Sequence, residues 1–173
     1  MWCRLKDIFI DRAGLSYKKD NLLHKSDKMI RVLRGGNIID GSYVIKDDDV
    51  MISSDFVDEK QFLRRNQIIT PAVTSIEKIG KLSRIDIDQL NTVAGGFVLV
   101  LTPFVDYDEL SVFISNFLQS PYAVKYMRTI TKKSGQAFYN LSRPLLMNML
   151  IPLPSSNNQI EINKQLSLFT QLL

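Results

Sequence analysis

Short apolar runs separated by polar turns characterise the first hundred residues of the chain. Apolar and β-branched side chains gather at positions 30–33, 50–52 and 97–101, with Gly, Asp and Asn between the runs. Runs of this length bounded by turn residues are typical of β-strands. The run at 97–101 is continuously apolar, which predicts a strand buried on both faces. Positions 43–45 give a further candidate strand, whereas the polar segment 11–28 predicts a long loop.

After residue 106 the apolar spacing becomes that of a helix. Positions 110–118 place apolar side chains three or four residues apart, and Asp108 and Glu109 precede them. Acidic residues at a helix N-terminus interact favourably with the helix dipole. Pro121 and Pro144 suit the first turns of a second and a third helix. Strands followed by helices, without regular alternation, predict an α+β domain with a twisted mixed or antiparallel sheet and helices packed to one side.

A last helix is expected at the C-terminus. Its apolar residues recur at intervals of four, three and four: Ile162, Leu166, Phe169 and Leu173. This is the spacing of a helical seam, although it covers too few heptads to indicate a coiled coil. We expect the seam to bind a partner protein or a second copy of the chain, and packing against its own domain is the alternative. The chain then divides into a globular domain, residues 1–154, and an association helix, residues 155–173.

The composition indicates a soluble protein with one core. The chain has 173 residues, of which 45% are hydrophobic, enough for a single globular domain. Its one cysteine, Cys3, allows no internal disulfide and suits a reducing cytoplasm. Charged residues interrupt the N-terminal segment 1–12, so a signal peptide is not expected. The longest apolar stretch, 95–101, is too short to cross a bilayer, and we expect no membrane partner.

Few residues are available for catalysis or metal binding. A Cys–His pair would have to join Cys3 to His24, the single histidine, and these two residues cannot supply the four ligands of a zinc site. The three consecutive aspartates at 47–49 offer ligands for a hard cation, although a solvated turn is the simpler interpretation. Asp86 and Asp88 are the carboxylates that an enzymatic alternative would use. We expect neither a catalytic residue nor a metal site on this chain.

Positive charge dominates the second half of the sequence. No Asp or Glu occurs between positions 111 and 160, and the net charge of the chain is +4. The cations of this segment are Lys125, Arg128, Lys132, Lys133 and Arg143. An uninterrupted positive field favours a polyanion as partner.

The Gly-containing turn from Lys132 to Asn140 carries the clearest binding chemistry. Lys132 and Lys133 can neutralise neighbouring phosphates. The amide groups of Gln136 and Asn140 suit the edge of an adenine, and Tyr139 offers a flat apolar face. The alternative is a solvated loop between two helices, with its aromatic residues packed on the core.

Four segments follow one another in an order that resembles a known family. They are 31–38 with Asp40-Gly41, 63–85 with Gly80-Lys81, Ser134-Gly135-Gln136 with Asn140-Leu141, and the exit Ile151-Pro152-Leu153-Pro154 before a Gln-containing helix. In this order they resemble the DNA specificity (S) subunits of type I restriction–modification systems, and in particular one of their target recognition domains. The resemblance covers nearly the whole chain. Since such subunits carry two recognition domains, it corresponds to one half of them.

The resemblance implies a non-catalytic module that reads one half of a split sequence in double-stranded DNA. It would direct partner modification (methyltransferase) subunits and a restriction subunit to that site. S-adenosylmethionine would be bound by the methyltransferase, because this chain shows no motif for any cofactor. Residues 1–154 would form the target recognition domain, and 155–173 the start of the spacer helix. The DNA-binding residues expected are Lys132, Lys133, Ser134, Gln136, Tyr139, Asn140, Arg34, Ser75, Lys78 and Lys81.

Two alternatives remain open at this point. The same fold can serve as the recognition module of a larger, fused restriction–modification enzyme. A basic adaptor that binds acidic proteins and no DNA would have a similar charge pattern.

Overall fold

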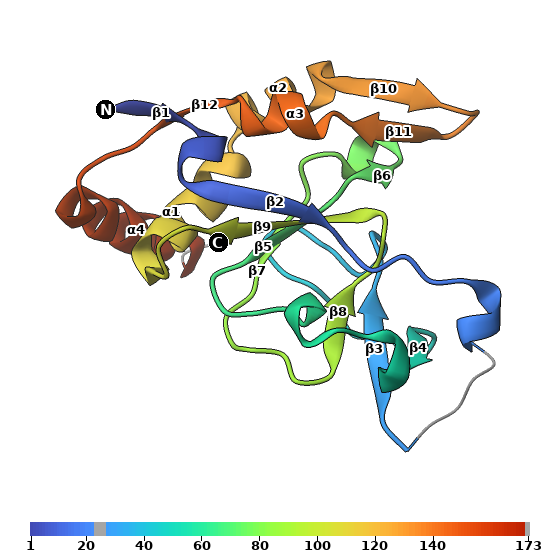
Figure 1. Cartoon of the computed structure of the whole chain (residues 1–173). Helices are drawn as coiled ribbons and strands as arrows, with labels where there is room; N and C mark the ends of the chain where they lie inside the picture. Colours follow the sequence, from blue (N-terminus) through green and yellow to red (C-terminus); the bar gives the residue numbers. More distant parts are fainter. Residues whose placement is uncertain (23–26, 172–173) are drawn as a thin grey trace.

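A central four-stranded antiparallel sheet organises the molecule. The computed structural model describes residues 1–22 and 27–171, with side chains up to Phe169. The strand order is β2–β9–β5–β7 (Figure 1). The strands are β2 (Phe9–Ala13), β5 (Ile68–Pro71), β7 (Ser83–Arg84) and β9 (Val98–Pro103). The first four residues of β9 are buried, as its continuous apolar run predicts.

Successive residues of the central strands contribute to two different cores. Ile68, Leu99 and Leu101 belong to one apolar cluster, whereas Ile69 and Val100 belong to another. Because side chains alternate between the faces of a strand, the sheet separates the two clusters. Both faces are therefore covered.

Helices cover the first face of the central sheet. They are α1 (Asp108–Leu118), α2 (Pro121–Thr129) and α3 (Arg143–Met147). Ser120 begins α2, because its Oγ accepts a hydrogen bond from the Ala123 N–H at 3.2 Å and Pro121 occupies the first turn. Ile114, Leu118 and Met127 from these helices join the cluster that contains Leu99.

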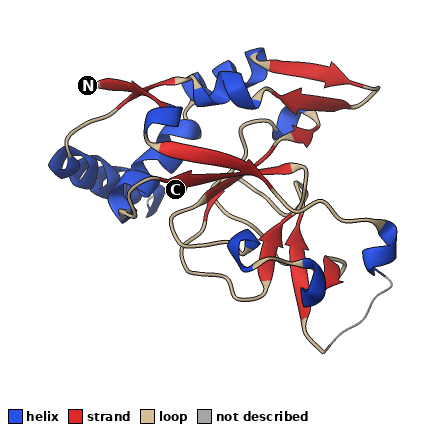
Figure 2. Ribbon diagram, in the orientation of Figure 1, coloured by secondary structure: helices blue, strands red, loops and turns tan. Residues whose placement is uncertain are grey.

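A second sheet lies on the other side, in a part of the molecule made of strands and short helical turns (Figure 2). Its order is β4–β3–β8, with β3 antiparallel to β4 and parallel to β8. The strands are β3 (Met29–Leu33), β4 (Val50–Ser53) and β8 (Thr92–Ala94). The 3-10 turns are η1 (Leu5–Asp7), η2 (Lys19–Leu22), η3 (Ser54–Phe56), η4 (Glu59–Gln61) and η5 (Ile76–Lys78). Leu33 and Ala94, at the ends of β3 and β8, pack in the same cluster as Ile69.

A third sheet has the order β10–β11–β6. Its strands are β6 (Val73–Thr74), β10 (Thr131–Ser134) and β11 (Phe138–Leu141). Strand β6 follows directly after β5, so one stretch of chain joins the third sheet to the central one. The segment that the sequence predicted as a turn is thus a hairpin that is hydrogen-bonded to a third strand.

The beginning of the chain is paired with the segment that leads to the last helix. Strand β1 (Trp2–Arg4) runs antiparallel to β12 (Leu150–Pro152), and the Met1 amino group donates a hydrogen bond to the Leu153 carbonyl at 3.3 Å. Helix α4 (Ser156–Gln171) then packs along α1.

The predicted α+β architecture is confirmed, with helices on one side of the sheet, and so are the three helices before α4. Two local predictions are wrong. Positions 43–45 form no strand, because only Tyr43 makes an isolated bridge, to Ile38. The loop predicted from residue 11 begins later, since Asp11–Ala13 belong to β2 and pair with β9.

Candidate nucleic-acid interface

The β10–β11 hairpin is anchored on one side and open at its tip. Strand β11 pairs with β6 through Tyr139 and Asn140, opposite Thr74 and Val73. The tip is a turn at 135–137, and Figure 1 shows the ribbon extending from the end of α2 to this turn. Gly135 has a φ of +71°, in the left-handed region that favours glycine.

The two lysines of the hairpin point to opposite faces. Lys132 lies opposite Asn140 and Lys133 lies opposite Tyr139 in the antiparallel register. Directly opposed residues share a face and successive residues alternate. Lys132 and Asn140 therefore lie on the face of Phe138, and Lys133 lies on the face of Tyr139. The sequence suggested two equivalent lysines, but the strand geometry separates them.

The remaining hairpin residues also divide by position. Ser134 lies opposite Phe138 beside the turn, and so shares the face of Lys132. Gln136 occupies the exposed turn itself. Of the two amide side chains predicted to read bases, Gln136 is therefore at the tip, and Asn140 is near the anchored end.

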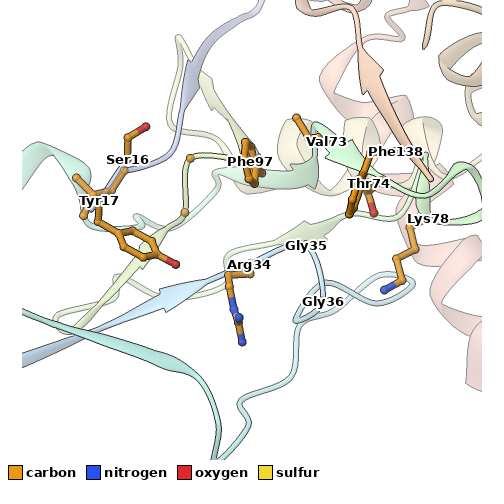
Figure 3. A pocket seen from close by; sticks show the side chains of 13 residues that line it. Ser16, Tyr17, Arg34, Gly35, Gly36, Val73, Thr74, Lys78, Phe97 and Phe138 are labelled. Atoms are coloured by element: carbon orange, nitrogen blue, oxygen red, sulfur yellow. The ribbon is translucent and has the colours of Figure 1, made fainter. Parts of the chain in front are cut away.

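A pocket of ≈ 510 Å³ lies between this hairpin and the ends of β3 and β8 (Figure 3). Arg34 and Lys78, both predicted DNA-binding residues, line it together with Tyr17, Phe97 and Phe138. Figure 3 shows the two phenylalanine rings on one side and the charged ends of Arg34 and Lys78 on the other. Among the residues that the structure describes, no acidic side chain lines the pocket. The chemistry of this surface is positive and aromatic.

A buried polar network fixes the loop that carries Arg34. The Asn37 side-chain amide donates to the Asp49 carboxylate at 2.5 Å, and its oxygen accepts the Arg34 N–H at 2.8 Å. The other Asp49 oxygen accepts the Lys46 N–H at 2.9 Å and lies 3.3 Å from Arg31 Nε. Burial alone raises the pKa of Asp49, but the hydrogen bonds from Lys46 and Asn37 and the neighbouring arginines bring this pKa below its ordinary value.

Ser75 and Lys81 lie outside the pocket. Ser75 precedes η5, and its hydroxyl donates to the Glu77 carboxylate at 2.5 Å. Lys81 pairs with Asp40 at 3.2 Å and lines a separate pocket that contains Gly80. Strands β5 and β7, within segment 63–85, are paired, but the chain between them forms β6 and η5, so Lys78 and Lys81 lie at different sites.

The sequence analysis missed Tyr17, Phe97 and Phe138, which line the pocket, and Asn37 and Asp49, which fix the loop of Arg34. Phe97 follows Gly95 and Gly96 in the turn before β9, and Gly-Gly-Phe was the available signal. Phe138 was placed on the core only by the alternative interpretation of this turn, and 57% of it is exposed. Asn37 and Asp49 carried no signal, because Asp49 belongs to a run of aspartates with the composition of a solvated turn.

The carboxylates considered for other chemistry are engaged in structural contacts. Asp86 forms a salt bridge with Arg84, and Asp88 accepts the Arg65 N–H at 2.8 Å. Within residues 1–22 and 27–171, no group of three or more His, Cys, Asp or Glu side chains is placed to hold a metal ion. Cys3 pairs with Ile151 in the β1–β12 sheet, and His24 lies outside the described residues.

Helix α4 carries the residues predicted to bind a partner. Ile162 packs against the apolar cluster that contains Leu99 and Ile114. The Asn163 side chain donates a hydrogen bond to the Glu109 carbonyl at 2.9 Å. Leu166 and Phe169 are 41% and 68% exposed, and Leu173 lies outside the described residues. Of the predicted seam, Ile162 therefore packs on the domain, whereas Leu166 and Phe169 are exposed. No helix in the described part of the chain has the length and apolar character to span a membrane.

Comparison with solved structures relates this fold to known proteins. No protein-family model and no curated protein matches the sequence. The S subunit of a type I restriction–modification system from M. genitalium is similar over 99% of this chain and 39% of its own, with a TM-score of 0.64 and 16% identity. A structure concerning complex assembly and conformational transition of the type I system contains a chain that is similar over 99% of this one and 38% of its own, with a TM-score of 0.69 and 15% identity.

A third similar structure is the type IIG restriction endonuclease BpuSI, which covers 95% of this chain and 26% of its own, with a TM-score of 0.61 and 12% identity. The chain thus spans less than two fifths of the length of the proteins it matches. The predicted resemblance is confirmed at the level of the fold. The chain has the α+β fold found in the S subunits of type I restriction–modification systems.

Proposed function

We propose that this domain reads one half of a split DNA sequence and holds a partner methyltransferase and a restriction subunit at that site. The observation that carries the proposal is the match of 99% of the chain to the S-subunit fold, with TM-scores of 0.64 and 0.69. The charge distribution supports it, since the described residues that line the pocket beside the hairpin include Arg34 and Lys78 and no acidic residue.

The hairpin is suited to a DNA groove. The major groove admits a two-stranded β-ribbon. If the hairpin enters the groove tip first, its two faces are turned toward the two walls of the groove. Lys132 and Lys133, on opposite faces, would then neutralise phosphates of different strands, while Gln136 at the tip reaches base edges. Phosphate contacts would set the register and base contacts the specificity.

The chemistry of methyl transfer belongs to the partner in this proposal. S-adenosylmethionine would be bound by the methyltransferase, and this chain would contribute binding energy alone. Phe169, exposed on α4, belongs to the surface proposed to dock the partner or a second copy of the chain.

A second candidate is the recognition module of a fused enzyme. The similarity to BpuSI, over 95% of this chain, favours it, because that protein is a type IIG restriction endonuclease and the match covers only 26% of its chain. Both candidates require DNA binding by the same hairpin and pocket.

Salt-dependent binding to duplex DNA tests the proposal. We expect the isolated chain to bind non-specific duplex with a Kd of about 10⁻⁴–10⁻⁶ M at physiological salt, and with a steep loss of affinity as salt increases. Fluorescence anisotropy with a labelled duplex between 50 and 200 mM salt measures both. An affinity that does not change with salt concentration, or no binding at the lowest salt, would favour the protein adaptor.

A further inference from the structure

Two phenylalanine rings of the pocket have no role in the phosphate and base-edge contacts described above. Phe97 is 68% exposed and Phe138 is 57% exposed, although both line the pocket. Exposed apolar surface that is gathered in a concave site indicates binding. Phe104 has a similar exposure, 59%, but lines a different pocket, and so provides a matched control.

The backbone segments that carry Phe97 and Phe138 are both hydrogen-bonded to the same short strand, β6, or to the residue before it. The Phe97 carbonyl accepts the N–H groups of Ala72 at 2.8 Å and Val73 at 3.3 Å, and the Val98 N–H closes the turn onto the Gly95 carbonyl at 2.8 Å. Phe138 begins β11, whose next residue pairs with β6. The backbone on both sides of the pocket is therefore fixed before any ligand binds, which lowers the entropic cost of binding.

The space and charge around the rings fit a nucleotide. Gly35, Gly36, Gly95 and Gly96 line the pocket, so the backbone is open to a ligand there. The side chain of Lys78 forms no hydrogen bond or salt bridge with a described residue, and that of Arg34 makes one long contact, 3.5 Å to the Asp48 carbonyl. Flat aromatic faces with nearby cations are the surface on which unstacked bases bind.

A paired base cannot use this surface, because its neighbours in the duplex cover both of its faces. An aromatic ring can stack only on a base that has left the helical stack. We propose that the pocket binds one unpaired nucleobase of the bound DNA, stacked on Phe97 or Phe138, with Arg34 and Lys78 neutralising the adjoining phosphates. This inference rests on the proposed function and adds a subsite for a base outside the duplex.

The test compares three labelled duplexes with identical sequence apart from one central position. The first is fully paired, the second carries a single bulged adenine, and the third carries an abasic bulge with the same charge. We expect the chain to bind the adenine bulge at least about fivefold more tightly than the abasic bulge, the lower end of the contribution from stacking one base. Phe97→Leu and Phe138→Leu should reduce this ratio, while Phe104→Leu should leave it unchanged.

A pocket-filling variant supports the same test without removing an aromatic residue. Gly36 lines the pocket, and a Cβ added there would meet only Lys46 Nζ, at 3.9 Å. Gly36→Leu should abolish the preference for the adenine bulge and preserve binding to the paired duplex. Circular dichroism confirms that each variant is folded.

The possible outcomes separate the two proposals. Salt-dependent binding with equal affinity for the adenine and abasic bulges would overturn the base pocket and leave DNA binding standing. A preference for the adenine bulge that survives both phenylalanine substitutions and Gly36→Leu would also overturn it, since the base would then bind elsewhere. Absence of binding to all three duplexes at low salt would overturn the proposed function and this inference together.

Discussion

At the scale of single residues, the aspartate run at 47–49 shows how one buried side chain organises the loop that carries Arg34. Asp49 is buried, whereas Asp47 and Asp48 are exposed. Its carboxylate joins Asn37, Lys46 and Arg31, and Asn37 in turn holds the backbone of Arg34. The position of Arg34 beside the pocket therefore depends on an acidic residue that does not itself face the pocket.

We expect Asp49→Asn to destabilise the fold by about 1–3 kcal/mol at neutral pH, because an amide group would face a hydrogen-bond donor in a buried site. The pKa of Asp49 is lowered in the folded state, so its contribution to stability is complete above the unfolded pKa of about 3.9 and is lost as the pH falls through the folded value. The difference between wild type and variant should shrink correspondingly in acid. Urea denaturation from pH 7 to pH 3 measures this difference, with Asp47→Asn as the exposed control. An equal effect of the two substitutions would contradict the network.

Two glycines with positive φ provide a second comparison. Gly135 has a φ of +71° and no atom within 4 Å of an added Cβ, whereas Gly80 has a φ of +94° and Val124 Cγ2 at 2.8 Å. Gly135→Ala should cost about 1 kcal/mol from backbone conformation alone. Gly80→Ala should cost clearly more, since Val124 must also move. The urea midpoints of the two variants compare these costs. Equal losses of stability would show that Val124 moves aside at no cost.

At the scale of elements, the hairpin determines which residues act together. Period-two alternation separates Lys132 from Lys133, and the turn places Gln136 farther from the anchored end than Asn140. A helix or loop with the same sequence would distribute these side chains differently.

We expect Lys132→Ala and Lys133→Ala each to weaken binding to all duplexes and to reduce the salt slope by about 1. Gln136→Ala should instead alter preference at particular base pairs, by roughly 1–3 kcal/mol, in the complex assembled with the methyltransferase. Anisotropy titrations give the slopes, and selection from a randomised duplex library gives the preferences. Lys60→Ala, which removes an exposed lysine paired with Asp58, is the control. If it matched the hairpin variants, the charge effect would be general.

Helix α4 combines two kinds of apolar residue, so substitutions in it should have separable effects. Ile162→Asp should destabilise the domain, because Ile162 packs against the core. Phe169→Asp should leave the urea midpoint nearly unchanged, because Phe169 is 68% exposed, and should weaken association with the methyltransferase. Denaturation and size-exclusion chromatography of the mixed subunits measure the two effects. Normal assembly of the Phe169 variant would place the interface elsewhere.

At the scale of the whole molecule, the sequence predicted the elements whose signals are local. The helices at 108–118 and 121–129 follow from apolar spacing, acidic N-terminal residues and Pro121. The β10 strand could not be predicted in this way, since Thr-Lys-Lys-Ser has no apolar pattern and becomes a strand by pairing with β11. The pocket joins residues from positions 15 to 138, and the buried Asp49 is hydrogen-bonded to Asn37. Such long-range arrangements leave little trace in local composition.

The pairing of β1 with β12 has a consequence for how this domain connects to other structures. Because Met1 and Leu153 are hydrogen-bonded, the chain enters and leaves the domain at nearly the same point. The residues between Met1 and Leu153 form one folded unit whose two ends lie side by side. Such a unit can be exchanged for another of different sequence without altering the separation of its two ends. Under the proposed function, such an exchange would change the DNA sequence that is read and leave the positions of the two ends unchanged.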